Sequence, residues 1–302
     1  MKIVNKAGRS HTLVFPVNMY FFVIPALVLF VTFWIFPIFQ MFYYSITDFN
    51  GINFNYSFVG ARNFVSIFQD GTLSNSLRNT AVYTLIVVVL TNVLGLGTAL
   101  LLNANIKAKG FFRTFCFLPT LFSAIVVGFI WSYVFMPGGG MVASLIHMVG
   151  GNADRFNILG NFRTALYGII IVDIWRSFGY TMLIYLAGLQ TIDTSLLEAA
   201  RIDGCNETRC IAYIKIPLLY FTITINTVLS VINGLKAFDG AFIMTNGGPG
   251  RSTNTLMFAI YRMAFTERQM ARGSALSVVS FVLIVVVTLT LLFYMNKREV
   301  EI

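Results

Sequence analysis

The stretch Gly273–Tyr294 reads GSALSVVSFVLIVVVTLTLLFY and contains no charged residue. Because an α-helix needs about 20 predominantly apolar residues to cross a lipid bilayer, this stretch by itself predicts a transmembrane helix. A second uncharged run extends from Thr12 to Thr47. That run is too long for the apolar core of a signal peptide, and no small-residue cleavage pattern follows it. We therefore expect it to be retained as a membrane span.

The composition of the whole chain agrees with these two stretches. Of its 302 residues, 57% are hydrophobic and 11% are charged, whereas an ordinary soluble domain is about 45–50% apolar and about 25% charged. So few charges cannot cover a water-exposed surface of this size, and the apolar content excludes a disordered chain. The chain is predicted to be an integral membrane protein.

The same length criterion predicts six transmembrane helices in one all-α domain that occupies residues 1–302. Proline is expected to kink a helix and to leave carbonyl groups that need neighbouring partners. Pro25 and Pro37 lie in the first span, and Pro119 lies near the start of the third. The expected spans are about 17–44, 79–102, 114–135, 164–189, 217–235 and 273–294.

The basic residues between the spans predict the orientation. With the N-terminus in the cytoplasm, the cytoplasmic segments carry eleven Lys or Arg and the outer segments carry nine. Five of those nine lie in the outer loop 236–272, which is an anomaly under the positive-inside rule. Without that loop the bias is clear, so both termini are predicted to be cytoplasmic.

Several functional classes are disfavoured by what the chain contains. The net charge is +9, but no basic cluster with interleaved aromatic residues points to nucleic acid. The three cysteines form no CxxC pair, and His11 and His147 are isolated, so no metal site is expected. There is no phosphate-binding loop of the form GxxxxGK[ST]. We expect no cofactor in this chain and no enzymatic bond chemistry.

The loop 190–216 differs from the other connections because it holds seven charged residues. Ser195 and Glu198 fit a capping box, with Ser195 as the N-cap of a short helix. Gly204 suits the left-handed position that ends such a helix, and Asn206 could cap a second turn. Pro217 fits the first turn of the fifth span. Two short charged helices between spans suggest a docking surface for a soluble partner.

The segment Glu198–Gly204, EAARIDG, followed by Ile214–Pro217, IKIP, resembles the EAA signature of the membrane subunits of binding-protein-dependent ABC importers. Further matching pieces are Asn79-Thr80, Phe111–Thr114, Leu118-Pro119, Ala187–Gln190 and Thr245–Pro249. Together they resemble the carbohydrate-uptake branch, which includes maltose-type and glycerol-phosphate permeases. This resemblance implies the permease fold of that family, with six transmembrane helices and a cytoplasmic coupling helix between spans four and five.

The resemblance also implies a set of partners in a bacterial or archaeal cytoplasmic membrane. These are a second homologous permease subunit, an extracytoplasmic solute-binding protein, and two ATP-binding subunits that hold ATP and Mg²⁺. From residues alone, Glu198 could equally serve only as a helix cap. The resemblance assigns docking on the ATP-binding subunits to Glu198, Ala199, Ala200, Asp203 and Gly204.

Asp173 and Arg176 lie within the fourth span, three residues apart and on one helix face. Charges at membrane depth are expensive, so they either pair with each other or line a cavity. The residues alone leave both readings open, and Trp175 offers an aromatic face nearby. The resemblance implies a solute pathway lined by Thr120, Ser123, Asp173, Arg176, Ser177, Tyr180, Ser230 and Asn233.

Two features of the outer loop complete the prediction. Asn246, Gly247, Gly248 and Pro249 are by themselves a turn, and the resemblance implies that they face the solute-binding protein. The apolar residues of the following stretch have helical spacing, with Arg262 on another face, which suggests a helix lying at the outer membrane surface with its arginines at headgroups. Those apolar residues are Leu256, Ile260, Met263 and Ala264.

The predicted function is translocation of a sugar through an ATP-driven importer, with hydrolysis by partner subunits. One alternative is a secondary transporter that is driven by an ion gradient and relies on Asp173 and Arg176; it would need no docking helix and usually shows paired repeats. A second is an ABC importer of a non-sugar solute such as glycerol phosphate. An intramembrane enzyme is disfavoured because neither histidine lies at membrane depth.

Overall fold

The computed structural model describes residues 2–4, 10–12, 21–104, 106–152 and 157–297. Within them, a short antiparallel hairpin of β1 (Lys2–Val4) and β2 (Ser10–Thr12) precedes an otherwise helical chain. The helical elements in chain order are α1 (Ile24–Phe30), η2 (Val31–Ile35), α2 (Phe36–Ser45), α3 (Arg62–Gln69), α4 (Thr72–Asn103), α5 (Lys109–Phe117), η3 (Leu118–Leu121), α6 (Ala124–Val134), α7 (Met141–Met148), α8 (Ala165–Gln190), α9 (Thr194–Ile202), α10 (Glu207–Cys210), η5 (Ile211–Lys215), α11 (Ile216–Leu218), α12 (Tyr220–Leu235), η6 (Ala241–Thr245), α13 (Leu256–Tyr261), η7 (Arg262–Thr266) and α14 (Met270–Asn296).

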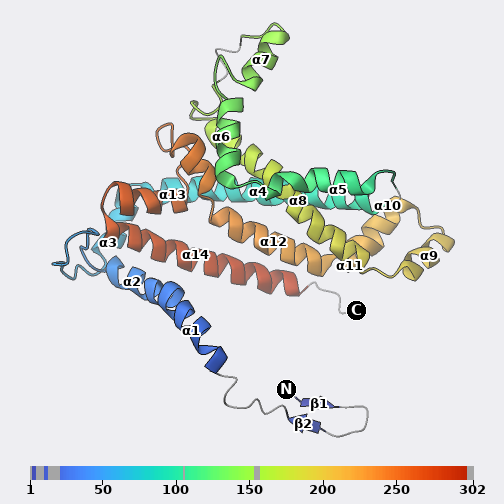
Figure 1. Cartoon of the computed structure of the whole chain (residues 1–302), viewed down its shortest axis with the longest axis horizontal. Helices are drawn as coiled ribbons and strands as arrows, with labels where there is room; N and C mark the ends of the chain where they lie inside the picture. The colour runs from blue at the N-terminus through green and yellow to red at the C-terminus, as the bar shows by residue number, and fades with distance from the viewer. Residues whose placement is uncertain (1, 5–9, 13–20, 105, 153–156, 298–302) are drawn as a thin grey trace.

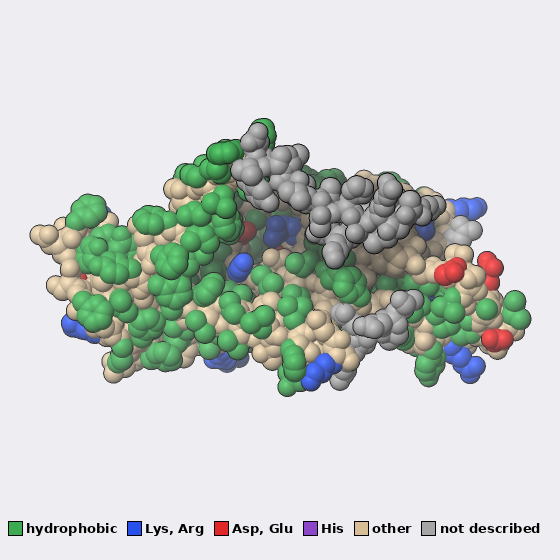
Figure 2. Space-filling view, turned by 90° about the horizontal axis from the view of Figure 1, so that it is seen from below, with side chains coloured by type: hydrophobic (Ala, Val, Ile, Leu, Met, Phe, Trp, Pro, Cys, Tyr) green, Lys and Arg blue, Asp and Glu red, His purple; other side chains and the backbone are tan. Residues whose placement is uncertain are grey.

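The long helices α4, α8, α12 and α14 run along the length of the molecule, while α6 and α7 project from its side (Figure 1). Helix α4 packs against both α8 and α12, and α14 packs against α12 and α2. Hydrophobic side chains are spread along the length of the part of the face that Figure 2 colours, as expected for a surface in contact with lipid. Charged side chains on that face include a group in a central hollow and another at the α9 end.

Four of the predicted spans appear as unbroken helices in the part of the chain that the structure describes: Ile24–Ser45, α4, α8 and α14. Residues 17–20 of the first predicted span lie outside the described residues. Helix α4 begins at Thr72, about two turns before the predicted start. Its first turns are polar, and the backbone N–H of Thr72 donates to Asp70 at 2.9 Å. The helix therefore extends beyond the apolar stretch that revealed it.

The predicted spans at 114–135 and 217–235 each appear as a bent pair of helices, and the expected interruption near Pro119 is present. The third span is bent by 96° between η3 and α6, and the fifth is bent by 69° between α11 and α12. Pro119 lies in η3, just before this bend, where its missing N–H and fixed φ disfavour a continuing α-helix. Pro217 does occupy the first turn of α11, as predicted. With each bent pair counted as one span, the described residues hold up to six spans.

The helices approach closely where a glycine faces a neighbouring backbone. A Cβ built on Gly179 of α8 would lie 2.1 Å from the carbonyl oxygen of Cys116 in α5. A Cβ on Gly234 of α12 would lie 2.8 Å from Cγ2 of Thr84 in α4. These contacts need glycine because no side-chain atom fits between the two helices.

The stretch predicted to lie at the outer membrane surface is instead packed inside the protein. Leu256, Met263 and Ala264 are at most 7% exposed, and the first two join a core cluster with residues of α3, α4 and α14. The apolar face of this stretch packs against other helices, whereas the sequence pattern was interpreted as contact with lipid. This expectation is therefore corrected.

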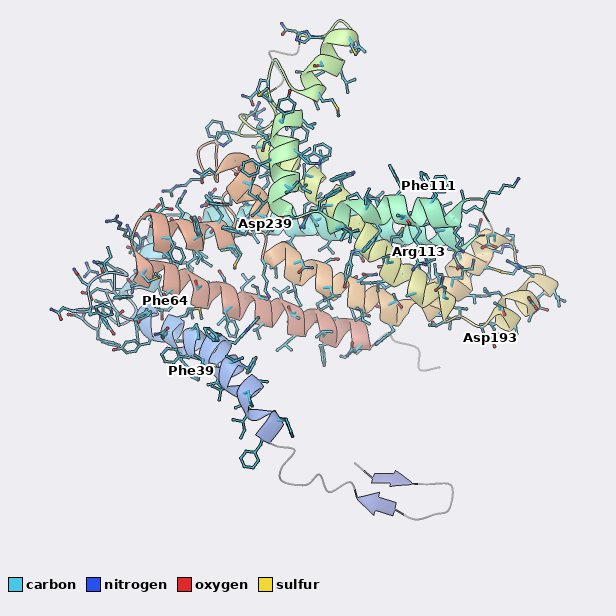
Figure 3. All side chains as sticks on the ribbon, viewed as in Figure 1. Phe39, Phe64, Phe111, Arg113, Asp193 and Asp239 are labelled. Atoms are coloured by element: carbon cyan, nitrogen blue, oxygen red, sulfur yellow. The ribbon has the colours of Figure 1, made fainter. Side chains whose placement is uncertain are left out.

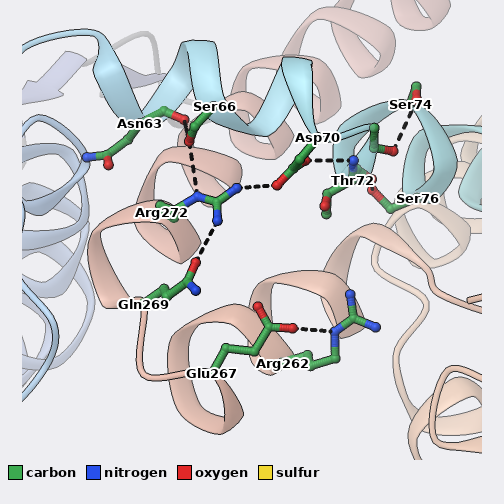
Figure 4. Close-up of polar contacts among 11 residues, drawn as sticks. Asn63, Ser66, Asp70, Thr72, Ser74, Ser76, Arg262, Glu267, Gln269 and Arg272 are labelled. Carbon is green, nitrogen blue, oxygen red and sulfur yellow. Dashed lines mark hydrogen bonds and ion pairs between the residues drawn. The ribbon is translucent and has the colours of Figure 1, made fainter.

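The arginines near this stretch pair with carboxylates (Figure 4). Arg262 Nε lies 3.1 Å from Glu267 Oε1. Arg272 contacts Asp70 across the helix ends and donates to Ser66 Oγ at 3.0 Å and to Gln269 Oε1 at 2.7 Å. Part of the excess positive charge in loop 236–272 is thus neutralised within the protein.

The close approach at Gly179 predicts a stability difference between two glycine substitutions. Gly179→Ala should destabilise the protein by about 1–3 kcal/mol because the added methyl group overpacks the α5–α8 contact. Gly97→Ala in α4 is the control: a Cβ there has no atom within 4 Å, so it should be neutral or stabilise the helix by about 0.5–1 kcal/mol. Thermal unfolding in detergent measures both. Equal shifts for the two variants would contradict the packing argument.

The contact between Asp70 and Arg272 predicts a pH-dependent stability. Partial burial acts to raise the pKa of Asp70, but the Thr72 N–H and the Arg272 guanidinium outweigh it and hold the pKa below 3.8. A carboxyl with a lowered pKa stabilises the fold above its ordinary pKa, and this is lost as the pH falls through the lowered value. Asp70→Asn should therefore be less stable than the wild type by up to about 1 kcal/mol at pH 7.

The difference between Asp70→Asn and wild type should shrink as the pH is lowered below about 4. Thermal unfolding from pH 7 to pH 3 measures it. Asp203→Asn is the control, since Asp203 is exposed and forms no ion pair with a described residue. A difference for Asp70→Asn that stays constant across this range would show that the charge of Asp70 is not what matters.

Candidate functional site

A cavity of about 370 Å³ lies between α4, α8, α12 and the segment that follows α12. Its wall combines hydroxyl, amide and charged groups with the rings of Tyr83, Tyr180 and Phe238. Asp239, one of its wall residues, lies near the middle of the molecule in Figure 3. The cavity is therefore at the depth of the spans and remote from α9.

The structure brings most of the predicted pathway residues together in this cavity. The residues on its wall are Thr120, Asp173, Arg176, Ser177, Tyr180, Ser230 and Asn233. Ser123 is not on the wall; its hydroxyl accepts a hydrogen bond from the Ile125 N–H at 3.3 Å and caps α6. Trp175 also lies off the wall, with its ring 5.5 Å from that of Trp131.

The cavity holds two carboxylates and two cationic groups. Arg176 Nη2 lies 3.1 Å from Asp173 Oδ1, so these two form the ion pair that one reading of the sequence predicted. Their side chains are 30% and 24% exposed, which leaves both accessible from the cavity. Lys236 and Asp239 also line it and form no ion pair with a described residue. Asp173 and Arg176 therefore both pair with each other and line a cavity, so the two interpretations of the sequence are compatible.

Sequence reasoning missed Lys236 and Asp239 because they follow the predicted end of the fifth span and resembled ordinary loop charges. Their position directly after an apolar helix was the only sequence feature that could have indicated a place in the cavity wall. It also missed Tyr83, Thr91 and Asn226, since uncharged polar residues inside spans carry no distinguishing pattern.

Hydrogen bonds hold the cavity wall in position. Thr120 Oγ1 donates to the carbonyl oxygen of Arg176 at 2.8 Å and so ties the bend of the third span to α8. Tyr185 donates to Asn92 Oδ1 at 2.6 Å, and Asn92 Nδ2 lies 3.4 Å from Ser230 Oγ. Fixed polar groups beside aromatic faces are suited to a ligand rich in hydroxyl groups.

Helix α9 forms the second candidate site, at the end of the molecule marked by Asp193 in Figure 3. The predicted capping box is wrong: Asp193, not Ser195, is the N-cap and accepts from the Ser195 N–H at 2.9 Å. That hydrogen bond lowers the pKa of Asp193. The helix therefore starts two residues earlier than predicted, and Asp193 caps the N–H at its second position. Glu198 is consequently free of the capping role and exposed.

The remaining local predictions for this loop are confirmed. Gly204 has a φ of +83° and ends α9. Asn206 caps α10 by accepting from the Arg209 N–H at 2.9 Å. No described residue of α9 is buried; Ile202 at its end is 87% exposed, and Tyr213 in η5 is 78% exposed. These two apolar side chains, absent from the predicted docking set, enlarge the candidate surface.

Glu207 connects α9 to the start of the fifth span. Its Oε1 accepts from Lys215 Nζ at 2.5 Å, and its Oε2 lies 3.6 Å from Arg201 Nη2. The Lys215 side chain is 9% exposed, whereas those of Glu207 and Arg201 are more than half exposed. The buried ammonium group thus depends on one carboxylate, through which a displacement of α9 can reach α11.

The loop that contains Asn246–Pro249 is anchored on the beginning of α4. Asn246 and Gly247 have left-handed φ values of 48° and 78°. Thr253 Oγ1 donates to the Gly248 carbonyl at 2.9 Å, and Asn79 Nδ2 donates to the carbonyl of Arg251 at 3.0 Å. The turn predicted from glycine and proline is present, and it lies at the opposite end of α4 and α8 from α9.

Comparison with known proteins gives one matching family. The family described as "Binding-protein-dependent transport system inner membrane component" matches residues 91–300. A probable starch degradation products transport system permease protein, AmyD, from Thermoanaerobacterium thermosulfurigenes is 34% identical over 93% of this chain and 94% of its own. The sn-glycerol-3-phosphate transport system permease protein UgpA of Escherichia coli O157:H7 is 30% identical over 92% and 94%.

Two further similarities cover nearly the whole chain. The multiple sugar-binding transport system permease protein MsmF of Streptococcus mutans is 34% identical over 92% of this chain and 95% of its own. A chain from the crystal structure of a bacterial ABC transporter that imports alginate superposes with a TM-score of 0.82, at 21% identity over 93% and 95% of the two chains. At that identity the structural match establishes the fold alone.

The dependence of Lys215 on Glu207 predicts a charge-specific stability effect. Glu207→Gln should destabilise the protein by about 1–3 kcal/mol because it leaves a buried ammonium group without its counter-charge. Adding Lys215→Met should restore most of the loss, since the buried charge is then gone. Thermal unfolding in detergent measures all variants, with Glu198→Gln as an exposed control. Failure of Lys215→Met to compensate would refute the proposed dependence.

Proposed function

The chain belongs to the family of binding-protein-dependent transport system inner membrane components, and from this premise we propose that it is the translocation subunit of an ATP-driven importer of a sugar or oligosaccharide. An extracytoplasmic binding protein delivers the solute, and two partner subunits bind and hydrolyse ATP. The chain does no bond chemistry itself. It is a multi-pass protein of the cytoplasmic membrane.

The central cavity carries this proposal. It brings Asp173, Arg176, Lys236 and Asp239 to one space with hydroxyl groups and aromatic rings. The opposed charges can donate to and accept from the hydroxyl groups of a neutral or charged saccharide, and a ring face of Tyr83 or Tyr180 can contact its apolar side. The relatives' names favour a sugar, and UgpA keeps a glycerol phosphate as the second candidate.

Helix α9 is the proposed coupling element. Exposed Glu198 and Asp203 offer carboxylates to basic residues of an ATP-binding subunit. Ala199 and Ala200 allow that subunit to approach closely, and Gly204 gives the chain a sharp exit. The contacts from Arg201 of α9 to Glu207, and from Glu207 to Lys215, would carry the motion of α9 into the bent fifth span.

The ends and sides of the helix bundle offer surfaces for the solute-binding protein, the second permease subunit and lipid. With α9 in the cytoplasm, the loop Asn246–Pro249 faces outward, toward the solute-binding protein, and both termini are cytoplasmic. Helix α1 has no buried residue, so its surface is available to lipid or to the second permease subunit.

The test uses the complete transporter reconstituted in lipid vesicles with its ATP-binding subunits and binding protein. Coupling is reciprocal, so the solute-loaded binding protein should stimulate ATP hydrolysis and solute should accumulate only with ATP. An ion-gradient transporter would instead accumulate solute without ATP. ATP hydrolysis that does not respond to the loaded binding protein would also overturn the proposal.

A matched glycine pair tests the role of α9. Gly204→Val should leave assembly intact but reduce ATP-driven uptake at least about tenfold, which corresponds to about 1.4 kcal/mol of lost coupling. Gly150→Val is the control, because Gly150 has a similar φ of +77° and equally open surroundings at a site away from α9. Normal uptake by Gly204→Val, or equal loss in both variants, would remove α9 from the mechanism.

A further inference from the structure

A second cavity, of about 570 Å³, lies at the end of α4 and α8 that is opposite to α9. We call it the outer cavity. The residues of its wall that matter here are Arg78, Asn79, Phe162, Arg163, Tyr167 and Gly250. It is separate from the central cavity, since the two share no wall residue.

The outer cavity is positively charged. Arg78 and Arg163 are its only charged wall residues among those described. Neither guanidinium lies within 4.0 Å of a carboxylate of a described residue, in contrast to Arg262 and Arg272. Basic residues on the outer side run against the usual charge distribution of membrane proteins. Several outer basic residues besides Arg262 and Arg272 form no ion pair with a described residue, and of these Arg78 and Arg163 meet in one cavity.

The walls of the outer cavity are held by contacts between distant segments. The side-chain amides of Asn75 and Asn79 both donate to the carbonyl of Arg251, each at 3.0 Å. A Cβ on Gly250 would lie 2.3 Å from the ring of Phe162, so this ring packs directly on the loop backbone. The two arginines therefore lie beside a loop that is held in place. A planar guanidinium there can bind a carboxylate or phosphate with two parallel hydrogen bonds.

The outer and central cavities follow each other along the same two helices. On α4, Asn79 lines the outer cavity and Tyr83 and Val87 line the central one. Residues four apart share a helix face and are about 6 Å apart along the axis. On α8, Leu166 lines the outer cavity and Asp173 the central one. A solute moving inward along this face meets the two arginines before the balanced charges.

We propose that the outer cavity is an anion subsite that receives the carboxylate or phosphate group of an acidic carbohydrate on its way to the central cavity. The proposal rests on the proposed import function and narrows its substrate class. Arg78 and Arg163 bind the anionic group, and Tyr167 and Phe162 border the sugar ring. Once the solute passes, Arg176 and Lys236 offer the next cationic groups.

The test measures binding to the complete transporter in lipid nanodiscs. The probes are a uronic-acid trisaccharide, a neutral hexose trisaccharide and glycerol 3-phosphate. Arg78→Gln and Arg163→Gln should each weaken binding of at least one acidic probe about tenfold or more, as expected for loss of a charged hydrogen bond. Binding of the neutral probe should change less than about twofold. Whichever acidic probe is affected identifies carboxylate or phosphate as the recognised group.

Arg268→Gln is the matched control, since Arg268 lies in the outer loop 236–272, which contributes Gly250 to the cavity wall, but is not itself on that wall. Arg78→Lys should fall between wild type and Arg78→Gln because it keeps the charge and loses the two-pronged geometry. Elution of each complex from size exclusion checks assembly. Raising the salt concentration should weaken acidic-probe binding to wild type more than to the Gln variants.

Three outcomes would overturn the anion subsite. The wild type could bind neither acidic probe saturably. The Gln variants could lose affinity for acidic and neutral probes equally, or lose affinity for neither. They could instead weaken association of the solute-binding protein while acidic-probe binding stays unchanged, which would make the outer cavity a protein-docking contact. Stimulation of ATP hydrolysis by the loaded binding protein is recorded in parallel, so failure of the import function is distinguishable from failure of the subsite.

Discussion

The cost of a charged or unpaired polar group in hydrocarbon shapes this protein more than any other constraint. Each such group costs several kcal/mol unless it is paired or hydrated. Asp173 and Arg176 meet this constraint by pairing at 3.1 Å beside a cavity. Lys215, almost buried, meets it through Glu207. Because such groups need a partner or water, the few charged residues mark the cavities and the helix ends at which the protein can act.

The same constraint explains where the spans bend. A broken helix exposes backbone groups, which is tolerable at membrane depth only beside protein or water. The bend of the third span is tied to α8 through Thr120, and Thr120 also lines the central cavity. The segment after α12 brings Lys236 and Asp239 to the same space. The irregular segments are thus where polar side chains and backbone reach the central cavity, as in transporters with interrupted helices.

Local patterns predicted some elements well and others poorly, for physical reasons. The long helices α8 and α14 were found from apolar length, and Gly204 and Asn206 from turn and cap chemistry, because these signals are carried by adjacent residues. Ser195 was wrongly chosen as the cap because Asp193, an equally good capping residue, starts the helix two residues earlier. The outer helix at Leu256 was wrongly assigned to the membrane surface because an apolar face looks the same whether lipid or protein covers it.

The sequence by itself determined that the chain resides in a membrane, the positions of its long helices, and which short loop is charged and helical. The physical reason is that a helix in hydrocarbon needs a long apolar stretch, so charged residues are confined to a few positions. Only the tertiary structure decided which polar residues share a space. Thr120, Arg176, Ser230 and Asp239 come from distant parts of the chain, and residues 78 and 163 meet through helices that begin 93 positions apart, at Thr72 and Ala165. Such meetings depend on how helices pack and bend, which no local pattern encodes.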